Sequence, residues 1–437
     1  MLDAPSGLLA TDPETLEAFA RDRSALSLLR RLDELPAAVA RPSTTADVAA
    51  LLRWADDTKT PVVPRGLGSG VCGGAAAVGG SVVLDVGRLD RIVEVDEESR
   101  TVTVEAGVRG SDLERELERH GLTTGHYPQS LAISSVGGWI ATGSAGQASS
   151  GYGAIEHLVQ GLTAVLADGT VVELRPVPRS DAGPDLRTLF VGSEGTLGVV
   201  TEAVLACAPR PREWKWQAYA PERFADVIAL ARDVRGAFVV RGYDPVDAGM
   251  NFGHDGCVLL LGFAEREGEP LAARRLDSSL GEHWWTHRND AVELYEGIMG
   301  PARVWGPGVV VDSLETAAPW RALPGLYERV RGALAGRAEL VACHLSHVYR
   351  AGASLYFTFL VRGEDDESGV RAYLAAWEDA VAACHEAGGT LTHHHGVGRL
   401  KARFLERELG AGGLEVLRRV KRALDPNGIL NPGVLLP

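Results

Sequence analysis

Short runs of alternating apolar and polar residues predict a β-rich first half of the chain. Residues 92–96 and 101–105 alternate in this way around a Glu-Ser-Arg turn, which is typical of a β-hairpin. Residues 162–166 and 171–174 flank an Ala-Asp-Gly-Thr turn and predict a second hairpin, because Asp-Gly favours a tight reversal of the chain. The apolar run at 199–206 predicts a further strand that closes this region.

Helical periodicity occurs in fewer segments of the first half. Residues 46–55 predict a helix, and the hydroxyl residues of Ser43-Thr44-Thr45 stand where they can cap its N-terminus. Residues 111–120 predict a short charged helix, and residues 1–40 are mostly polar and helical in pattern. We therefore expect an N-terminal helical segment over 1–34 and a β-rich domain over 35–209.

The pattern changes beyond Pro211, where aromatic residues are frequent and strand-like runs alternate with helical ones. Strands are predicted at 214–219, 237–243, 257–263, 309–314 and 354–361, and helices at 224–234, 369–387 and 404–424. This mixture predicts an α+β domain over 210–388 and a mainly helical C-terminal segment over 389–437.

Glycine, serine and threonine crowd the segments 125–130, 134–139, 143–146 and 192–198. Glycine lets the backbone approach a ligand closely, hydroxyl residues add hydrogen-bond donors, and successive backbone N–H groups form a concavity for anions. Ordinary surface turns in a β-rich domain are the plain alternative. Because several such loops occur together, we interpret them as a cradle for a large phosphorylated cofactor.

An upstream glycine loop contains a formal G-x-G-x-x-G at Gly68, Gly70 and Gly73, with Asp85 near the distance expected of a ribose-binding acid. A Rossmann domain needs an amphipathic helix directly after this motif. Here Gly79-Gly80 interrupts the chain, and residues 81–86 predict another strand after the one at 61–64. The sequence therefore predicts strand, glycine loop and strand, whose backbone amides can still bind a pyrophosphate.

Composition narrows the functional class. A net charge of −14 without a basic stripe argues against nucleic-acid binding. Five scattered cysteines show neither metal-ligand spacing nor a disulfide framework, which favours a reducing cytoplasm. No apolar run approaches the ~20 residues that span a bilayer, and the N-terminus does not resemble a targeting peptide. We therefore expect a cytoplasmic globular protein of 437 residues and about two domains.

The sharpest chemical signal in the second half is His393-His394-His395, with glycines on both sides. Metal binding is disfavoured, because consecutive side chains do not all face one point and no nearby cysteine or carboxylate completes a zinc spacing. A plain polar loop is one interpretation. The glycines favour a backbone loop that brings the imidazoles to a pocket, where they can handle protons or carry charge. The sequence thus predicts no metal site.

A tyrosine on the predicted strand 354–361 is a second candidate. Tyr356, Thr358 and Leu360 share one face of the strand, and apolar residues occupy the other. A packed aromatic residue with a satisfied hydroxyl is the plain alternative. To act as a base near neutrality, Tyr356 needs a pKa below its ordinary ~10, and we expect neighbouring imidazolium charge to lower it.

The chain, from about Leu35 to its C-terminus, resembles flavoproteins of the vanillyl-alcohol oxidase type. More narrowly it resembles the alkyldihydroxyacetonephosphate synthases, on the segments 125–130, 311–320 and 352–359 and the triple histidine. The resemblance implies an α+β fold with a PCMH-type FAD-binding domain of two α+β subdomains. It also implies an α+β cap domain and a C-terminal segment that returns to the FAD domain.

The resemblance implies FAD as cofactor. We expect it to be held noncovalently, because Leu67, Gly68 and Ser69 stand where covalent relatives attach flavin through histidine or cysteine. The implied FAD-binding residues are Arg65, Gly66, Leu67, Gly68, Ser69, Gly70, Val71, Pro128, Gln129, Ser130, Leu131, Ala132, Ile133, Ser134, Thr142, Gly143, Ser144, Ala145, Glu194, Gly195, Thr196, Leu197, Gly198, Val199 and Val200.

The resemblance also implies an activity, the exchange of the acyl group of an acyl-dihydroxyacetone phosphate for a long-chain alcohol through a flavin N5 adduct. Tyr356 matches the family's proton-transferring tyrosine, and His393, His394 and His395 match its essential histidines. Arg241 resembles a required cap-domain arginine. Arg303 corresponds to a phosphate-binding arginine, although its surroundings, Gly-Pro-Ala-Arg-Val-Trp, depart from the family pattern.

Two other functions remain open at this point. One is an FAD-dependent oxidoreductase, a 2-hydroxy-acid or alcohol dehydrogenase or oxidase, in which histidines near the flavin receive the hydroxyl proton. The other is flavin binding without catalysis, which the polar cluster disfavours. The expected partners are a small-molecule or lipid-like substrate and a second copy of the chain in a homodimer. Peripheral contact of the protein with a membrane is compatible with this expectation.

Overall fold

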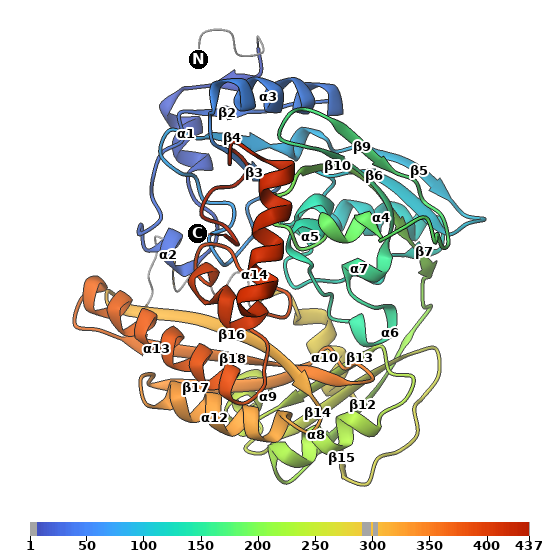
Figure 1. The fold of residues 1–437 in the computed structure, drawn as a ribbon. Helices are drawn as coiled ribbons and strands as arrows, with labels where there is room; N and C mark the ends of the chain where they lie inside the picture. The colour runs from blue at the N-terminus through green and yellow to red at the C-terminus, as the bar shows by residue number, and fades with distance from the viewer. Residues whose placement is uncertain (1–6, 291–298, 300–304, 437) are drawn as a thin grey trace.

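The computed structural model describes residues 7–290, 299 and 305–436 and has the α+β architecture that the sequence predicts. Figure 1 shows two stacked halves. Two small sheets with their helices form the upper half, and one large sheet with its helices forms the lower half. Helix α14 (Leu405–Leu424), drawn in red, rises beside the upper half and leads the C-terminus back to it.

The first sheet contains strands from the N-terminal region. Its order is β1 (Leu9–Ala10), β2 (Ala38–Ala40), β4 (Val82–Asp85) and β3 (Val62–Arg65). Strands β2, β4 and β3 are parallel, and β1 pairs antiparallel with β2. Between Arg65 and Val82 the chain forms turns and bends instead of a helix. The prediction of a strand, a glycine loop and a strand is confirmed.

The helices near this sheet follow the sequence pattern. Helix α3 (Thr45–Thr58) confirms the helix predicted at 46–55, and a capping box of Thr44 and Asp47 fixes its first turn. The N-terminal segment contains the short helices α1 (Pro13–Phe19) and α2 (Ala25–Leu28). It also contributes strand β1 to the sheet. The segment is therefore joined to the β-rich region by backbone pairing, which its polar pattern did not predict.

The second sheet is fully antiparallel. Its order is β5 (Ile92–Asp96), β6 (Thr101–Glu105), β10 (Val199–Ala206), β8 (Val159–Val165) and β9 (Val171–Leu174). Both predicted hairpins and the closing strand are confirmed. Helix α4 (Gly110–Arg119) confirms the charged helix. A small ladder of β7 (Leu122–Thr123) and β11 (Ala208–Pro209) lies where the two halves meet.

Short helices occur inside the glycine-rich stretch, where the sequence predicted loops and strand-like runs. They are α5 (Val136–Thr142), α6 (Ser149–Tyr152) and α7 (Ile155–Leu158). Gly137 and Gly138 lower the helix propensity of α5, so local pattern missed it. The helix forms because Val136, Trp139 and Ile140 are buried against the second sheet. Tertiary packing outweighs propensity here.

The large sheet has seven strands. Its order is β15 (Arg274–Leu276), β12 (Trp214–Ala220), β14 (Val258–Ala264), β13 (Val239–Tyr243), β17 (Leu340–Ser346), β18 (Gly352–Arg362) and β16 (Val309–Pro319). Its helices are α8 (Phe224–Asp233), α9 (Pro245–Phe252), α10 (Ser279–His287), α12 (Leu323–Ala335) and α13 (Asp366–Glu386). The strands predicted beyond Pro211 are confirmed, and so are α8 and α13. Strand β17 and helix α12 were not predicted.

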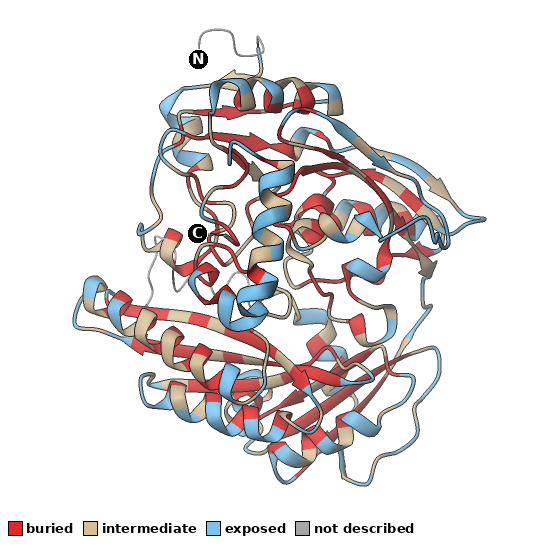
Figure 2. Ribbon diagram, viewed as in Figure 1, coloured by how far each residue is buried: buried red, intermediate tan, exposed pale blue. Residues whose placement is uncertain are grey.

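Residues are buried where the layers of the fold pack against one another. Figure 2 shows mostly buried strands in the large sheet and exposed outer surfaces on its helices and on α14. At the C-terminus, Ile429 and Leu430 are buried against α3 and β4, and Leu430 forms a bridge with Val62. The C-terminal segment therefore returns to the first sheet, as the resemblance implied. The domain bounds themselves stay a prediction.

Candidate active site

A cavity of about 710 Å³ lies between the two halves of the molecule. The glycine-rich loops of the upper half form one wall, and residues of β13, β17 and β18 contribute to the facing wall. Ordinary ligand sites have volumes of ~300–1,000 Å³. The cavity therefore has the size and the mixed polar lining of a binding site for a large ligand.

Most of the predicted FAD-binding residues line this cavity. They are residues 65–71, Pro128, Gln129, Ser130, Ile133, Ser134, Thr142, Ser144, Ala145, Glu194, Gly195, Gly198, Val199 and Val200. The lining does not include Leu131, Ala132, Gly143, Thr196 or Leu197. Three of them have contacts that shape the loops: Leu131 packs against the hydrophobic core, Gly143 ends α5 at positive φ, and Thr196 donates its hydroxyl to the Ser193 carbonyl.

Two observations show that this lining fits FAD. A Cβ added at Gly70 would have no atom within 4 Å, so the loop leaves open space that a ligand can fill. On the facing wall, the buried Ser346 hydroxyl has no hydrogen-bond partner among the described residues. Because a buried polar atom is costly without a partner, this hydroxyl is available to a bound molecule.

Replacing Gly70 by valine should remove FAD from the purified protein. Gly70 does not require positive φ, so the added side chain should fill the cradle without straining the backbone. The ratio of flavin absorbance to protein absorbance measures the loss. Gly332→Val is the matched control, because Gly332 is exposed on α12, has equally free space and lies outside the cavity. Full flavin occupancy in Gly70→Val would show that the loop is an ordinary turn.

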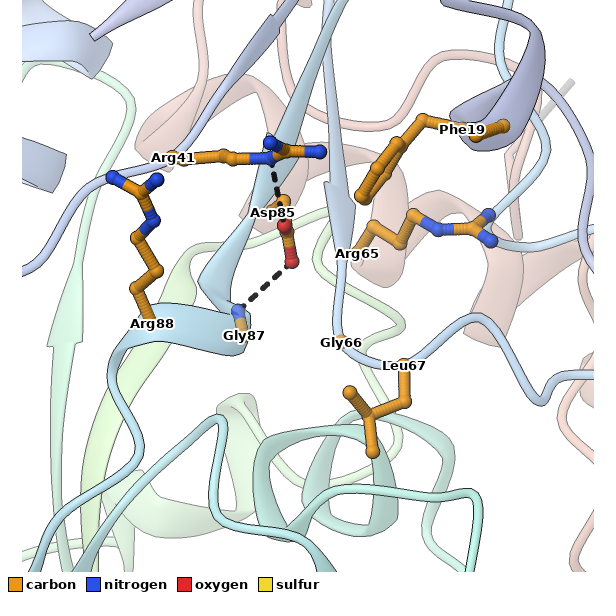
Figure 3. A pocket seen from close by; sticks show the side chains of 9 residues that line it. Phe19, Arg41, Arg65, Gly66, Leu67, Asp85, Gly87 and Arg88 are labelled. Carbon is orange, nitrogen blue, oxygen red and sulfur yellow. Dashed lines mark hydrogen bonds and ion pairs between the residues drawn. The ribbon is translucent and has the colours of Figure 1, made fainter. Parts of the chain in front are cut away.

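A smaller pocket of about 350 Å³ adjoins the glycine loop at Gly66 and Leu67 (Figure 3). Asp85 lies there and accepts the Gly87 N–H at 2.9 Å, while its other oxygen is 3.6 Å from Nε of Arg41. Asp85 is not part of the lining of the large cavity. Its local contacts agree with the rejection of the dinucleotide fingerprint.

The pairing register of the large sheet places the polar groups of the facing wall next to one another. Tyr356 on β18 pairs directly with His344 on β17 and with Glu315 on β16, and His344 pairs with Tyr243 on β13. Directly paired residues on neighbouring strands point to the same face of a sheet. One row across four strands therefore presents two tyrosines, a histidine and a carboxylate on one face.

The predicted catalytic residues meet at this row. The Tyr356 ring stacks on the His344 ring at 4.7 Å, and its centroid is 5.4 Å from that of His395 and 6.2 Å from that of His394. Arg241 lines the same cavity and donates Nε–H to the Tyr243 hydroxyl at 2.9 Å. His393 lies behind His394, outside the lining. Arg303 lies outside the described residues.

A fully buried ion pair holds the triple-histidine loop from one side. Lys401 Nζ donates to Glu315 at 3.2 Å and to the Thr392 hydroxyl at 2.9 Å. Glu315 also accepts the backbone N–H of His393 and, at 2.9 Å, that of His395. Burial alone would raise the pKa of Glu315, but the electrostatic influence of Lys401 and the neighbouring imidazoles together outweighs burial, and the pKa lies below its usual value. Glu315 is therefore an ionised clamp on the loop.

A second buried carboxylate holds the loop from the upper half. Glu194 accepts the Val397 N–H at 2.7 Å and the Gly398 N–H at 2.9 Å. Burial raises the pKa of Glu194 to about 7, and these two backbone donors oppose the rise. The segment from His393 to Gly398 is thus fixed between the two halves by carboxylates from both of them.

Burial reverses the electrostatics that the sequence suggested. It raises the pKa of Tyr356 above its usual value, and it lowers the pKa of His395 to about 4. The pKa values of His393 and His394 are also lowered by burial. These imidazoles are therefore neutral at pH 7 and provide no imidazolium charge. The expected lowering of the Tyr356 pKa is wrong, and Tyr356 is a protonated phenol in this structure.

Cys72, just beyond the glycine loop, lines the cavity and is a candidate for covalent attachment of the flavin. Burial raises the pKa of its thiol, which keeps the sulfur protonated and a poor nucleophile. Noncovalent attachment stays a prediction. Acid precipitation checks it, since a noncovalent flavin should leave the protein pellet colourless.

The sequence did not assign roles to several residues of the site. His344 pairs with Asp247 at 2.8 Å, and Nδ1 of His347 contacts the Ser149 hydroxyl at 2.7 Å. Both histidines line the cavity. Their only signal in the sequence is the His-x-x-His spacing before the strand that carries Tyr356. Glu315 lies in the segment 311–320 that carried the resemblance, but no role was assigned to it, and Lys401 had no signal in the sequence.

The helices among the described ranges include none that is long and apolar enough to cross a membrane. The subcellular compartment and the homodimer stay predictions.

Comparison with known proteins agrees with this geometry. Residues 36–175 match the family described as FAD binding domain, and residues 256–435 match the C-terminal domain of FAD linked oxidases. An uncharacterized FAD-linked oxidoreductase of Escherichia coli (strain K12), YgcU, is 32% identical over 92% of this chain and 89% of its own. An alkyldihydroxyacetonephosphate synthase of Trypanosoma brucei brucei is 30% identical over 98% of this chain and 79% of its own.

A solved structure of an alkyldihydroxyacetonephosphate synthase superposes with a TM-score of 0.79. It is 23% identical in sequence, and the match covers 98% of this chain and 83% of that one. The chain belongs to the FAD-linked oxidase family, with the PCMH-type fold and FAD as its cofactor.

Proposed function

We propose that the protein exchanges the acyl group of an acyl-dihydroxyacetone phosphate for a long-chain alcohol, in the manner of an alkyldihydroxyacetonephosphate synthase. One observation carries the proposal. Tyr356, the triple-histidine loop and Arg241, which the resemblance assigned to this activity, come from three distant parts of the chain and meet at the FAD cavity. Similarity to the trypanosomal synthase over nearly the whole chain supports it.

The protonation state of each residue determines the role that it can have in this reaction. Arg241 carries a fixed positive charge beside the cavity and can bind the phosphate of the substrate. The protonated phenol of Tyr356 can donate a hydrogen bond or a proton to a substrate oxygen. The neutral imidazole of His395, next to it, can accept the proton that the incoming alcohol loses. FAD, when bound, supplies the electrophilic ring of the reaction.

An FAD-dependent oxidoreductase is the second candidate, and the His344–Asp247 pair favours it. A carboxylate 2.8 Å from Nδ1 orients the imidazole and leaves Nε2 to accept a proton from a substrate hydroxyl. His344 lines the cavity beside Tyr356. The Escherichia coli relative YgcU is described as an FAD-linked oxidoreductase, which agrees with this alternative.

Anaerobic mixing of the FAD-bound protein with each substrate class distinguishes the two functions. With palmitoyl-dihydroxyacetone phosphate and hexadecanol, we expect free palmitate and the ether product, and an oxidised flavin spectrum at the end of turnover. Lasting loss of the oxidised flavin band with a 2-hydroxy acid or an alcohol alone, without ether product, would assign the protein to the oxidoreductases.

A further inference from the structure

We propose that His347, His393 and His394 bind a divalent cation of the zinc class at the wall of the FAD cavity. These side chains offer one ligand atom each, and the three atoms lie within 4.8 Å of one another. His347 lies directly after β17, and the other two belong to the triple-histidine loop. The fold thus supplies the converging third ligand that adjacent histidines in a chain cannot provide.

The ring positions match three imidazoles around one ion. The centroid distances are 4.9 Å from His347 to His393, 4.8 Å from His347 to His394, and 5.1 Å from His393 to His394. Zinc–nitrogen bonds of ~2.0–2.1 Å in a tetrahedral arrangement place imidazole centroids roughly 5 Å apart. The Nδ1 atoms of His393 and His394 are already 2.9 Å apart. Small ring rotations would complete the site.

Neighbouring hydroxyl groups fix which nitrogens face the centre. Ser149 Oγ is 2.7 Å from Nδ1 of His347, which leaves Nε2 for an ion. Tyr349 OH is 2.7 Å from Nε2 of His393, which leaves Nδ1. Metal-binding histidines ordinarily give their other ring nitrogen to such an outer partner. Two of the three histidines therefore already have the hydrogen bonds of ligands.

The surroundings suit an ion with an open coordination position. His347 and His394 line the cavity, so a fourth ligand, water or a substrate oxygen, can approach from that side. The carboxylate of Glu315 accepts the backbone N–H of His393, which fixes the backbone of this ligand. Three imidazoles and one open position are the donor set of a zinc site that can polarise a bound oxygen.

Zinc binding can be measured on the FAD-bound protein without any substrate, so its outcome does not depend on the proposed function. We expect protein treated with EDTA and then dialysed against Zn²⁺ to hold one zinc ion per chain by elemental analysis. X-ray absorption at the zinc edge should show imidazole ligands at ~2.0–2.1 Å. Ser149→Ala should weaken zinc binding by ~10–100-fold, the usual cost of losing an outer partner.

His347→Gln should weaken zinc binding by more than Ser149→Ala, because it removes a ligand. Flavin absorbance and circular dichroism confirm that each variant is folded, and His394→Gln repeats the test at a second ligand. His287→Gln is the control, because His287 and His283 form another histidine pair at the cavity, 4.2 Å apart by ring centroids. Absence of stoichiometric zinc, unchanged affinity in both ligand variants, or loss of zinc in His287→Gln would overturn the proposal.

Discussion

Replacing Tyr356 by phenylalanine is expected to lower turnover by about 10²–10⁴-fold while FAD stays bound, the usual cost of losing an acid–base group. The phenol lies in the FAD cavity, stacked on His344 and next to His395. Phenylalanine keeps the stacking and removes only the hydroxyl. Steady-state rates on flavin-saturated protein measure the effect.

A double variant tests whether Tyr356 acts as one unit with the loop. His395 suits this test because it is not one of the three proposed zinc ligands. Tyr356→Phe with His395→Gln should lose much less than the product of the two single losses, since groups in one proton-handling unit are not additive. Tyr327→Phe, which removes a buried hydroxyl outside the cavity, should keep its turnover. Full activity in Tyr356→Phe, or multiplicative losses, would contradict the assigned roles.

The second large effect is expected at the buried ion pair. Lys401→Met should lower the free energy of unfolding by about 3–5 kcal/mol, because it leaves the fully buried carboxylate of Glu315 without its cation. The loop of His393 to His395 depends on that carboxylate, so turnover should fall as well. Urea unfolding of the FAD-bound protein measures the stability change.

Two further variants complete this test. One also replaces Glu315, the partner of Lys401, and the other breaks an ion pair at the surface. Lys401→Met combined with Glu315→Gln should cost less than the sum of the single changes, because no uncompensated charge then remains buried. Arg337→Met breaks a half-exposed pair with Asp379 and should cost only ~0–1 kcal/mol. If Lys401→Met costs no more than Arg337→Met, the pair does not hold the loop.

Local sequence was sufficient for most of the secondary structure. The hairpins of the second sheet, helix α13 and the strand–loop–strand around Gly68 follow from periodicity and turn residues, which depend on neighbours along the chain. Helix α5 was missed for the same reason. Its glycines oppose a helix locally, and only burial of Trp139 and Ile140 against the second sheet stabilises it.

The sequence identified part of the candidate residues. The resemblance of the chain to a known family pointed to more of them than the pattern of residue types did. The loops around Gly70 and Gly195 and the residues Tyr356 and His394 line the cavity as that resemblance implied. Their protonation states could not be foreseen. Burial sets the pKa values of Tyr356 and His395, and the sequence does not show how far each side chain is from water.

By itself, the sequence determined most of the strands, helices and glycine loops, because those depend on spacings of a few residues. Only the tertiary structure decided which side chains meet. The pairing of β17, β18 and β16 aligns His344, Tyr356 and Glu315, and a slip of one residue would turn a strand's side chains to the opposite face. The same packing brings His347 to the triple-histidine loop and buries Lys401 beneath it. Register and burial are long-range properties, and no local pattern in the chain encodes them.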